Sequence, residues 1–415
     1  MIKENIKYYK TLGICCCLIA SSIGVAINSS GVFYPAISES LQITQGSVSF
    51  SGTLLMICSA ITSLFIPKLM ERIVMKKMMM ISAFLAAFST ILIPIIPLTP
   101  IFYVCSALRG VSISFFSAVP ITILMNHWFH KNYGLFTSIV LGCSGITSAM
   151  LSPLLVGVIN EYGWQIAYIC MGMIQLILCF PAILGKFTLT PQEQQIEPYG
   201  TKQKTVTDNN IVYEHNQTDR KDIMNQFCIF LLFASFITAI TGVCQHFTSI
   251  CEESQMPIGV TAFVMTAVML GNISFKFLIG FLSDRIGAFV SCTLMISINV
   301  FAAIIFMLFH TPILYLLSSY LFGAIYSVSA VGIVLLIKEI FGETLYSRLY
   351  PIVSFTSNIA MALAIFFVGF LYDVTQTYNS IFVYVIILQC FNLLFLCVNR
   401  YHVMQSTNHK KRYAN

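Results

Sequence analysis

The stretch Gly280-Phe281-Leu282-Ser283-Asp284-Arg285-Ile286-Gly287 has an altered copy earlier in the chain. The earlier copy reads Pro67-Lys68-Leu69-Met70-Glu71-Arg72-Ile73-Val74-Met75-Lys76-Lys77. Placing Glu71 on Asp284 sets the two copies 213 residues apart in a chain of 415 residues. Each copy comes just after a long apolar stretch. An acidic and a basic residue repeated at half the chain length indicate two similar halves, a pattern typical of many secondary transporters.

The composition excludes an ordinary soluble domain. The chain is 57% hydrophobic and 9% charged, whereas soluble domains carry about a quarter charged residues. A membrane-spanning helix needs roughly 20 mostly apolar residues, and windows of that kind recur along the whole chain. We predict an all-α membrane protein of 12 transmembrane helices, placed at about 11–35, 45–68, 77–98, 100–126, 134–158, 163–185, 224–249, 258–282, 288–309, 312–338, 348–371 and 378–399.

A polar segment divides these helices into two sets of six. Residues 186–222 contain 11 charged residues and little apolar content. We interpret this segment as a tether without a binding site. The predicted organisation is an N-terminal six-helix bundle over 1–185, a cytoplasmic linker over 186–222, a C-terminal six-helix bundle over 223–399 and a cytoplasmic tail over 400–415.

The positive charges predict the orientation in the membrane. Of the 22 Lys and Arg residues, 20 fall in segments on one side of the predicted spans. The loops on the other side hold none. By the positive-inside rule both termini are cytoplasmic, and a plasma or inner membrane location is expected. The basic N-terminus followed by an apolar run resembles a signal peptide, but the run from Thr11 to Pro35 is too long and predicts an uncleaved first span. The net charge of +6 follows from this bias and indicates no nucleic-acid partner.

No pattern in the chain indicates an enzyme, a metal site or a cofactor. The 14 cysteines lie mostly in apolar runs and lack paired C-x-x-C spacing, so we expect them to pack as small apolar side chains. Nucleophile-elbow, Walker and H-E-x-x-H motifs are absent from the sequence. Transport would therefore be driven by a gradient or be passive.

Two cations, Arg109 and Lys276, lie inside predicted spans without a carboxylate beside them. All 16 Asp and Glu residues fall in tails, loops or span ends. A charge inside a membrane is costly and is usually kept for a task. An interior that offers only positive charge favours an organic anion as substrate over a cation or an unmodified sugar.

Each of these two cations has more than one interpretation. Lys276 lies eight residues before Asp284, about 12 Å along a helix. Its ammonium would reach the membrane surface, meet backbone carbonyls, or hold an anionic ligand. Arg109 would either support carbonyls of the first helix, the interpretation we favour, or bind a carboxylate through its planar fork of donors.

At this point the chain is identified as a member of the major facilitator superfamily, because Gly280–Gly287 resembles that superfamily's G-x-L-x-D-R-x-G loop. A longer stretch is similar to the monocarboxylate and oxalate–formate transporter branch. It contains Asn126-His127-Trp128-Phe129-His130-Lys131-Asn132-Tyr133-Gly134-Leu135, then Gly142-Cys143-Ser144-Gly145 and Gly163-Trp164-Gln165-Ile166-Ala167-Tyr168. Lys276-Phe277-Leu278-Ile279-Gly280 and Gly369-Phe370-Leu371-Tyr372-Asp373 also resemble that branch.

The resemblance implies roles for particular residues. Lys276 would contact a substrate carboxylate, and Arg109 would be linked to the central cavity. Asn358 stands where oxalate–formate carriers have a lysine, so a clamp of two cations is not expected. A gating role is implied for the two acidic-basic pairs. These are Asp284 with Arg285 and Glu71 with Arg72. Asp284 would face the start of the fifth helix near Tyr133 and Gly134, and Glu71 the start of the eleventh near Ser347 and Arg348.

Neutral polar residues within the spans have two interpretations. They would line the substrate path or form hydrogen bonds that join helices. The candidates are Asn28, Ser29, Ser30, Gln245, His246, Tyr326 and Asn358. We place Asn28 and Asn358 first because they have small neighbours, and we expect His246 to be an ordinary histidine near the outer end of its helix.

The sequence therefore predicts a secondary active transporter that moves a small organic anion, a monocarboxylate being expected, by alternating access. A coupled proton or a counter-anion is left open, and the monomer is the expected functional unit. Two alternatives remain. One is an exporter of broad specificity on the same fold, and the other is a membrane sensor that binds a ligand without transporting it.

Overall fold

The computed structural model describes residues 2–96, 98–129, 133–185, 188–200 and 220–413. Within these ranges 12 helices are long and apolar enough to cross a membrane. They cover Ile6–Leu41, Gln45–Ser63, Met75–Ile95, Thr99–Met125, Ile139–Tyr162, Trp164–Leu184, Met224–Glu253, Ile258–Ser283, Ala288–Leu308, Pro312–Gly342, Ile352–Thr375 and Asn379–Arg400. The prediction of an all-α membrane fold with 12 spans is confirmed.

The described chain is built from helices in both halves, beginning with those of the N-terminal half. They are α1 (Ile2–Ile19), α2 (Tyr34–Leu41), α3 (Gln45–Ser63), α4 (Ile66–Arg72), α5 (Met75–Ile95), α6 (Thr99–Ser114), α7 (Ala118–Trp128), α8 (Tyr133–Tyr162) and α9 (Trp164–Leu184). Those of the C-terminal half are α10 (Arg220–Val243), α11 (Phe247–Glu253), α12 (Ile258–Ile286), α13 (Ala288–Leu308), α14 (Pro312–Phe322), α15 (Ala324–Ser327), α16 (Ile333–Thr375) and α17 (Asn379–Tyr413). The long α16 contains the end of the tenth span and the whole of the eleventh, separated by a bend at Gly342, where φ is 78°.

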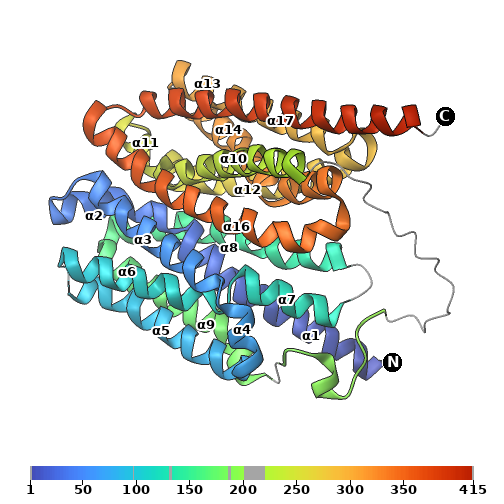
Figure 1. Cartoon of the computed structure of the whole chain (residues 1–415). Helices are drawn as coiled ribbons and strands as arrows, with labels where there is room; N and C mark the ends of the chain where they lie inside the picture. The colour runs from blue at the N-terminus through green and yellow to red at the C-terminus, as the bar shows by residue number, and fades with distance from the viewer. Residues whose placement is uncertain (1, 97, 130–132, 186–187, 201–219, 414–415) are drawn as a thin grey trace.

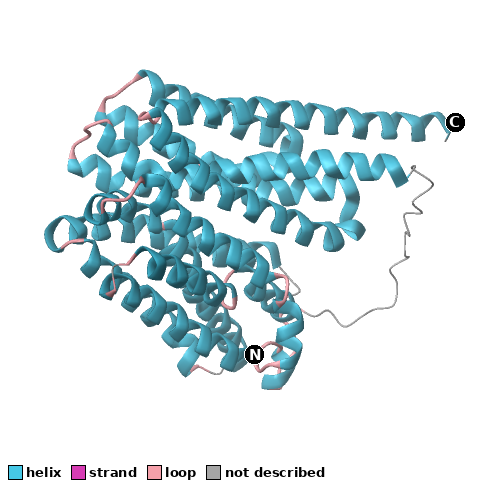
Figure 2. Cartoon of the chain, turned by 60° about the vertical axis from the view of Figure 1, so that its left-hand side comes forward, coloured by secondary structure: helices cyan, strands magenta, loops and turns pink. Residues whose placement is uncertain are grey.

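The two halves lie side by side, with α1–α9 below and α10–α17 above in Figure 1, and Figure 2 shows the same division. Contacts between the halves are most extensive where α3 meets α16 and where α8 meets α12. Both termini lie at the same end of the molecule (Figure 1). We call the opposite end, which carries α2, α11 and the loop at 376–378, the distal face.

Four spans that the sequence predicts as continuous helices are interrupted. The first span passes through a π-helical segment (Ala20–Asn28) and a 3₁₀ turn (Ser30–Phe33) before α2 begins. The fourth breaks between α6 and α7, the seventh at the 3₁₀ turn Cys244–His246, and the tenth at the π-helical segment Val328–Gly332.

Hydroxyl groups near the first break explain why it is tolerated. The Ser29 Oγ donates to the Gly24 carbonyl at 2.9 Å, and the Ser30 Oγ donates to the Ile27 carbonyl at 2.7 Å. Irregular backbone at membrane depth occurs where protein surrounds it or where it lines a cavity. The sequence prediction missed the breaks because a short serine-rich stretch does not interrupt an apolar pattern.

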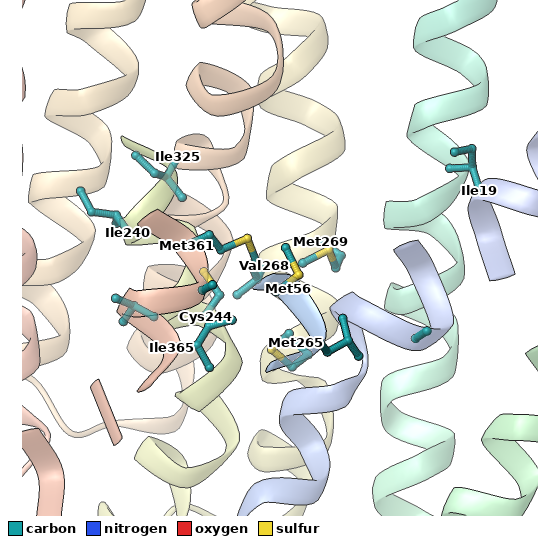
Figure 3. Packing of buried hydrophobic residues seen from close by; sticks show 14 of the residues in the cluster. Ile19, Met56, Ile240, Cys244, Met265, Val268, Met269, Ile325, Met361 and Ile365 are labelled. Carbon is teal, nitrogen blue, oxygen red and sulfur yellow. The ribbon is translucent and has the colours of Figure 1, made fainter. Parts of the chain in front are cut away.

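A cluster of methionines fills the space between the halves next to these breaks (Figure 3). Met56 comes from α3, Met265 and Met269 from α12, and Met361 from α16. All four side chains are buried. Methionine is unbranched and polarizable and adapts to irregular gaps, which suits the irregular space beside the interrupted helices.

Buried amides join three helices within the C-terminal half. The Gln389 Nε2 of α17 donates to the Asn299 Oδ1 of α13 at 2.6 Å, and the Asn392 Nδ2 donates to the Gln389 Oε1 at 3.0 Å. The Asn299 Nδ2 donates to the Phe322 carbonyl of α14 at 3.3 Å. Such hydrogen bonds hold helices together where the surrounding apolar surface gives little preference for one partner.

The described start of the linker, residues 188–200, packs against the N-terminal half. The Trp128 Nε1 donates to the Thr188 carbonyl at 3.2 Å, and the Tyr199 N–H donates to the Trp128 carbonyl at 2.8 Å. The Tyr8 hydroxyl donates to the Glu197 carbonyl, and the rings of Tyr8 and Tyr199 are 5.4 Å apart. This part of the linker is a docked segment rather than a free tether, and the rest of it lies outside the described residues.

Candidate substrate site

A small cavity lies between the two halves where the first, fourth and seventh spans approach each other. Its volume is about 20 Å³, comparable to the space needed by about one water molecule. The polar groups around it come from both halves. The lining residues are Ile27, Ser30, Tyr34, Ser51, Gly52, Leu55, Met56, Ser106, Arg109, Tyr168, Gln245 and Ile365.

Arg109 is the cation of this cavity, and its side chain is 2% exposed. Its Nη2 donates to the Ala26 carbonyl in the first span at 3.4 Å, which is the contact expected of a support for that helix. Its Cζ lies 5.7 Å from the ring centroid of Tyr168. Among the described residues its Nε has no hydrogen-bond partner and no carboxylate forms an ion pair with it. Arg109 therefore supports the first span and also presents an unused donor to the cavity.

Two further polar groups of the cavity have no partner among the described residues. These are the hydroxyl of Tyr34 and the Nε2 of Gln245. Gln245 is held across the two halves by a contact of its Oε1 with the Ser30 Oγ at 3.2 Å. An unpaired buried polar group is costly, so unpaired groups of Arg109, Tyr34 and Gln245 around one cavity are the strongest indication of a ligand site in the described structure.

Two glycines allow these side chains to come together. A Cβ at Gly52 would lie 2.5 Å from the Tyr34 hydroxyl oxygen, and a Cβ at Gly31 would lie 2.2 Å from the Gln245 carbonyl oxygen. Both distances are too short for any real side chain. The close approach of Gly31 to Gln245 also joins the first and seventh spans, so the two halves are in direct backbone contact beside the cavity.

His246 differs from its predicted surroundings. It is fully buried rather than placed at the outer surface, and its Nε2 lies 3.0 Å from the Ile365 carbonyl oxygen. The ring of Tyr34 packs against it in a T-shaped arrangement at 5.3 Å. His246 therefore positions Tyr34 at the edge of the cavity, and the break at Cys244–His246 is what turns it inward.

The other predicted substrate residues do not line this cavity. Lys276 is half-buried on α12, one helical turn from Ile273, which is in contact range of Gly145 on α8. No hydrogen bond of the Lys276 ammonium is found within the described part of the chain. Lys276 is therefore not brought together with Arg109 in the lining of this cavity.

Three predicted polar residues also lie outside the cavity lining. The Asn28 Nδ2 is 3.7 Å from the Met269 sulfur across the two halves. The Tyr326 hydroxyl donates to the Thr241 carbonyl at 3.4 Å, as expected of a hydrogen bond between helices. Asn358 is half-buried on α16.

The predicted gating residues are only partly described. Arg285 is exposed, and its Cζ lies 4.3 Å from the ring centroid of Phe281. Arg72 is exposed as well. The side chains of Asp284 and Glu71, and those of their predicted partners near Tyr133 and Ser347, lie outside the described residues. The gating roles therefore stay predictions.

A second and larger hollow, which we call the distal vestibule, opens at the distal face. Its volume is about 460 Å³. Its lining residues are Val32, Ala36, Glu39, Ser40, Val156, Ile159, Asn160, Gly163, Trp164, Thr248 and Glu252. On α9 the vestibule lies about one helical turn from the cavity, because Trp164 lines the vestibule, Tyr168 lines the cavity, and the two are four residues apart. The vestibule is separated from the cavity by the contact of Gly31 with Gln245 and by the rings of Phe33 and Tyr168, 4.2 Å apart.

The sequence analysis missed Tyr34 and Tyr168 as cavity residues. Tyr168 lies in the G-W-x-x-A-Y stretch, but that pattern does not say which way the ring points. Tyr34 directly follows the break in the first span, and the neighbouring Pro35 was its only local signal. All 14 cysteines are free, and within the described residues no group of three or more His, Cys, Asp or Glu side chains could hold a metal ion.

The fold and this site between two halves define a membrane transport protein. Residues 14–365 match the model of the Major Facilitator Superfamily, and the chain belongs to that family. It is 24% identical over 374 residues, 85% of each protein, to the Uncharacterized MFS-type transporter YcxA of Bacillus subtilis (strain 168).

Two solved structures share the fold at low sequence identity. A D-xylose-proton symporter superposes with a TM-score of 0.70 at 13% identity, covering 95% of this chain and 97% of that one. The nucleoside transporter NupG superposes with a TM-score of 0.68 at 11% identity, covering 95% and 97%. The chain is therefore a multi-pass membrane transporter, and its substrate is a separate question.

Proposed function

We propose that this chain is a secondary active carrier for a small organic anion of the monocarboxylate class. The observation that carries the proposal is the position of Arg109, a cation without a carboxylate partner among the described residues, on a cavity between the two halves. Hydrogen bonds to a charged group contribute about 1.5–3 kcal/mol. A carboxylate bound here would use the free Arg109 Nε and neutralise the buried charge.

The donors around the cavity support the same class of substrate. Arg109 and Tyr34 belong to the N-terminal half, and Gln245 belongs to the C-terminal half. One carboxylate that accepts from all three would join the two halves. Because only one of the three groups is charged, the cavity suits a single negative charge. Lys276 lies on α12 and does not line the cavity, so it would contact the substrate at another stage of transport.

The volume of the cavity supports transport by alternating access. A space of about 20 Å³ is too small for an organic substrate. The halves must move apart for a substrate to enter, and the methionine cluster of Figure 3 can repack as they do. We propose that both termini are cytoplasmic, that the membrane is the plasma or inner membrane, that the monomer is the working unit and that a proton or a counter-anion is coupled to transport.

Uptake of labelled substrates into proteoliposomes tests the substrate class. The panel contains acetate, lactate, pyruvate, oxalate, a nucleoside, a pentose and an organic cation, each measured with and without a pH gradient. We expect uptake of a monocarboxylate and no uptake of the neutral or cationic compounds. Uptake of a nucleoside or pentose without any uptake of an anion would refute the proposal.

The methionine cluster favours one alternative, an exporter of broad specificity. Flexible, methionine-rich surfaces bind varied apolar ligands, and Met56 lines the cavity beside Arg109. Such an exporter would move apolar compounds whether or not Arg109 keeps its charge. Transport of several unrelated apolar compounds by an Arg109→Gln variant would favour this alternative. Binding of an anion without any transport would instead favour the other alternative, a membrane sensor on the same fold.

A further inference from the structure

Asp373 connects the two halves at the distal face. It lies near the end of α16, in the C-terminal half. Its Oδ1 accepts from the Gln45 N–H at 3.2 Å, and its Oδ2 accepts from the Gly46 N–H at 2.9 Å. Gln45 and Gly46 are the first two residues of α3, in the N-terminal half. One carboxylate of one half thus binds the positive end of a 19-residue helix of the other.

Among the described residues, these two N–H groups at the start of α3 have no other partner. The first N–H groups of a helix cannot bond within the helix. The Thr44 hydroxyl caps the third of them, since its Oγ1 accepts from the Ser47 N–H at 3.2 Å. The Val48 N–H donates to the Thr44 carbonyl at 3.1 Å. The capping of α3 is therefore complete only while Asp373 stays in place.

The backbone around this contact is shaped for it. A Cβ at Gly46 would lie 2.6 Å from the Asp373 Oδ2, and a Cβ at Gly369 would lie 2.3 Å from the Ser49 Oγ and 3.0 Å from the Gly46 Cα. Glycine at both positions lets α3 and α16 approach closely. Two turns further along, the Thr53 Oγ1 donates to the Ala362 carbonyl at 2.7 Å. The contact is therefore one end of a long junction between the halves.

The junction of α3 with α16 is the most extensive contact between the halves, so its distal end must separate if the halves are to move apart at the distal face. We propose that Asp373 is a positioning residue of the transport cycle, whose carboxylate holds the distal side closed and releases the start of α3 when that side opens. The inference rests on the alternating access proposed above. It does not rest on the anionic substrate, because the contact joins the two halves without any ligand.

Chemical labelling measures the opening directly and needs no substrate. Ser30 lines the central cavity, so a Ser30→Cys variant reports access to the cavity. A Ser40→Cys variant reports the exposed vestibule. Vesicles are treated with a membrane-impermeant maleimide from the face on which Ser40→Cys reacts. The signal of the parent protein, with its native cysteines, is subtracted.

Adding Asp373→Asn should raise the labelling rate of the Ser30→Cys variant at least fivefold. Asparagine keeps the shape but removes the charge and one acceptor oxygen. Gly46→Ala, which displaces the carboxylate without removing it, should have the same effect. The matched control is Glu253→Gln. The Glu253 Oε2 also accepts a backbone N–H at the distal face, from Tyr378 at 3.1 Å, but both residues belong to the C-terminal half.

The control should leave the labelling rate within twofold of the parent, and all variants should stay monodisperse. Equal rates for Asp373→Asn, Gly46→Ala and Glu253→Gln would overturn the inference. Faster labelling in Asp373→Asn and Gly46→Ala, in a protein that takes up no anion, would support the role of Asp373 in closing the distal side and would refute the proposed substrate. The two proposals can therefore fail separately.

Discussion

The Arg109 guanidinium lies 5.7 Å from the ring centroid of Tyr168 and donates to the Ala26 carbonyl. An aromatic ring attracts a cation through its negative face, and the ring of Tyr168 therefore lowers the cost of burying this charge. Neither contact neutralises it. The arrangement keeps the guanidinium in a fixed place with one donor unused, which suits a site that binds a charged substrate and then releases it.

Removing the charge of Arg109 should slow anion uptake. Because a charge-assisted hydrogen bond contributes about 1.5–3 kcal/mol, we expect Arg109→Gln to lower the initial rate at subsaturating substrate at least about tenfold. Arg109→Lys should recover only part of this loss, since an ammonium lacks the planar fork of donors. The measurement is uptake of a labelled monocarboxylate into proteoliposomes. Lys77→Gln is the control, because Lys77 is an exposed cation, and an equal effect of both changes would contradict the prediction.

Gln245 should respond differently to loss of its donor and to gain of charge. Gln245→Leu removes the unpaired Nε2 while keeping a similar volume. A neutral hydrogen bond contributes about 1 kcal/mol, so we expect a roughly fivefold lower apparent affinity with an unchanged maximal rate. Gln245→Glu would place a carboxylate on the same cavity as Arg109 and should abolish uptake. Normal uptake by the Gln245→Glu variant would show that the anion does not bind in this cavity.

Lys276 provides a separate test of the substrate path. If Lys276 contacts the substrate, we expect the Lys276→Ala variant to lose anion uptake and the Lys276→Arg variant to keep part of it. Lys276 does not line the cavity, so we expect the Lys276→Arg, Arg109→Gln double variant to be slower than either single variant by the product of the two single effects. Rates are measured by the same uptake assay. Unchanged uptake in both single variants would remove Lys276 from the path.

The sequence predicts the membrane fold well and the site only in part. Long apolar windows and the repeated pair at Glu71 and Asp284 were enough for 12 spans, because membrane thickness fixes helix length. Arg109 was found since a buried charge stands out in an apolar span. The contacts of Ser30 with Gln245 and of Asp373 with Gly46 depend on the register between helices far apart in sequence, and no local pattern indicates them.

The buried amides of the C-terminal half should contribute to stability rather than to transport. Gln389→Leu removes the donor to Asn299 and the acceptor of Asn392. Hydrogen bonds between membrane helices contribute about 0.6 kcal/mol on average and up to about 1.7 kcal/mol. We expect a lower thermal midpoint in detergent with a substrate affinity equal to that of the parent. Cys390→Ser, a change at the exposed neighbouring position, serves as the control, and an equal midpoint for both variants would contradict a structural role.

Docking of the linker start should depend on the indole N–H of Trp128. Trp128→Phe keeps an aromatic ring but loses the hydrogen bond to the Thr188 carbonyl. A loss of about 1 kcal/mol would raise the detached fraction about fivefold. Glu193 is exposed within the docked segment, so cleavage after Glu193 by a glutamate-specific protease reports detachment. We expect cleavage there to be about fivefold faster in the Trp128→Phe variant.

Trp164→Phe is the matched control, because the other tryptophan of the chain lies at the distal vestibule. Equal cleavage of the two variants would show that the indole N–H of Trp128 does not hold the linker.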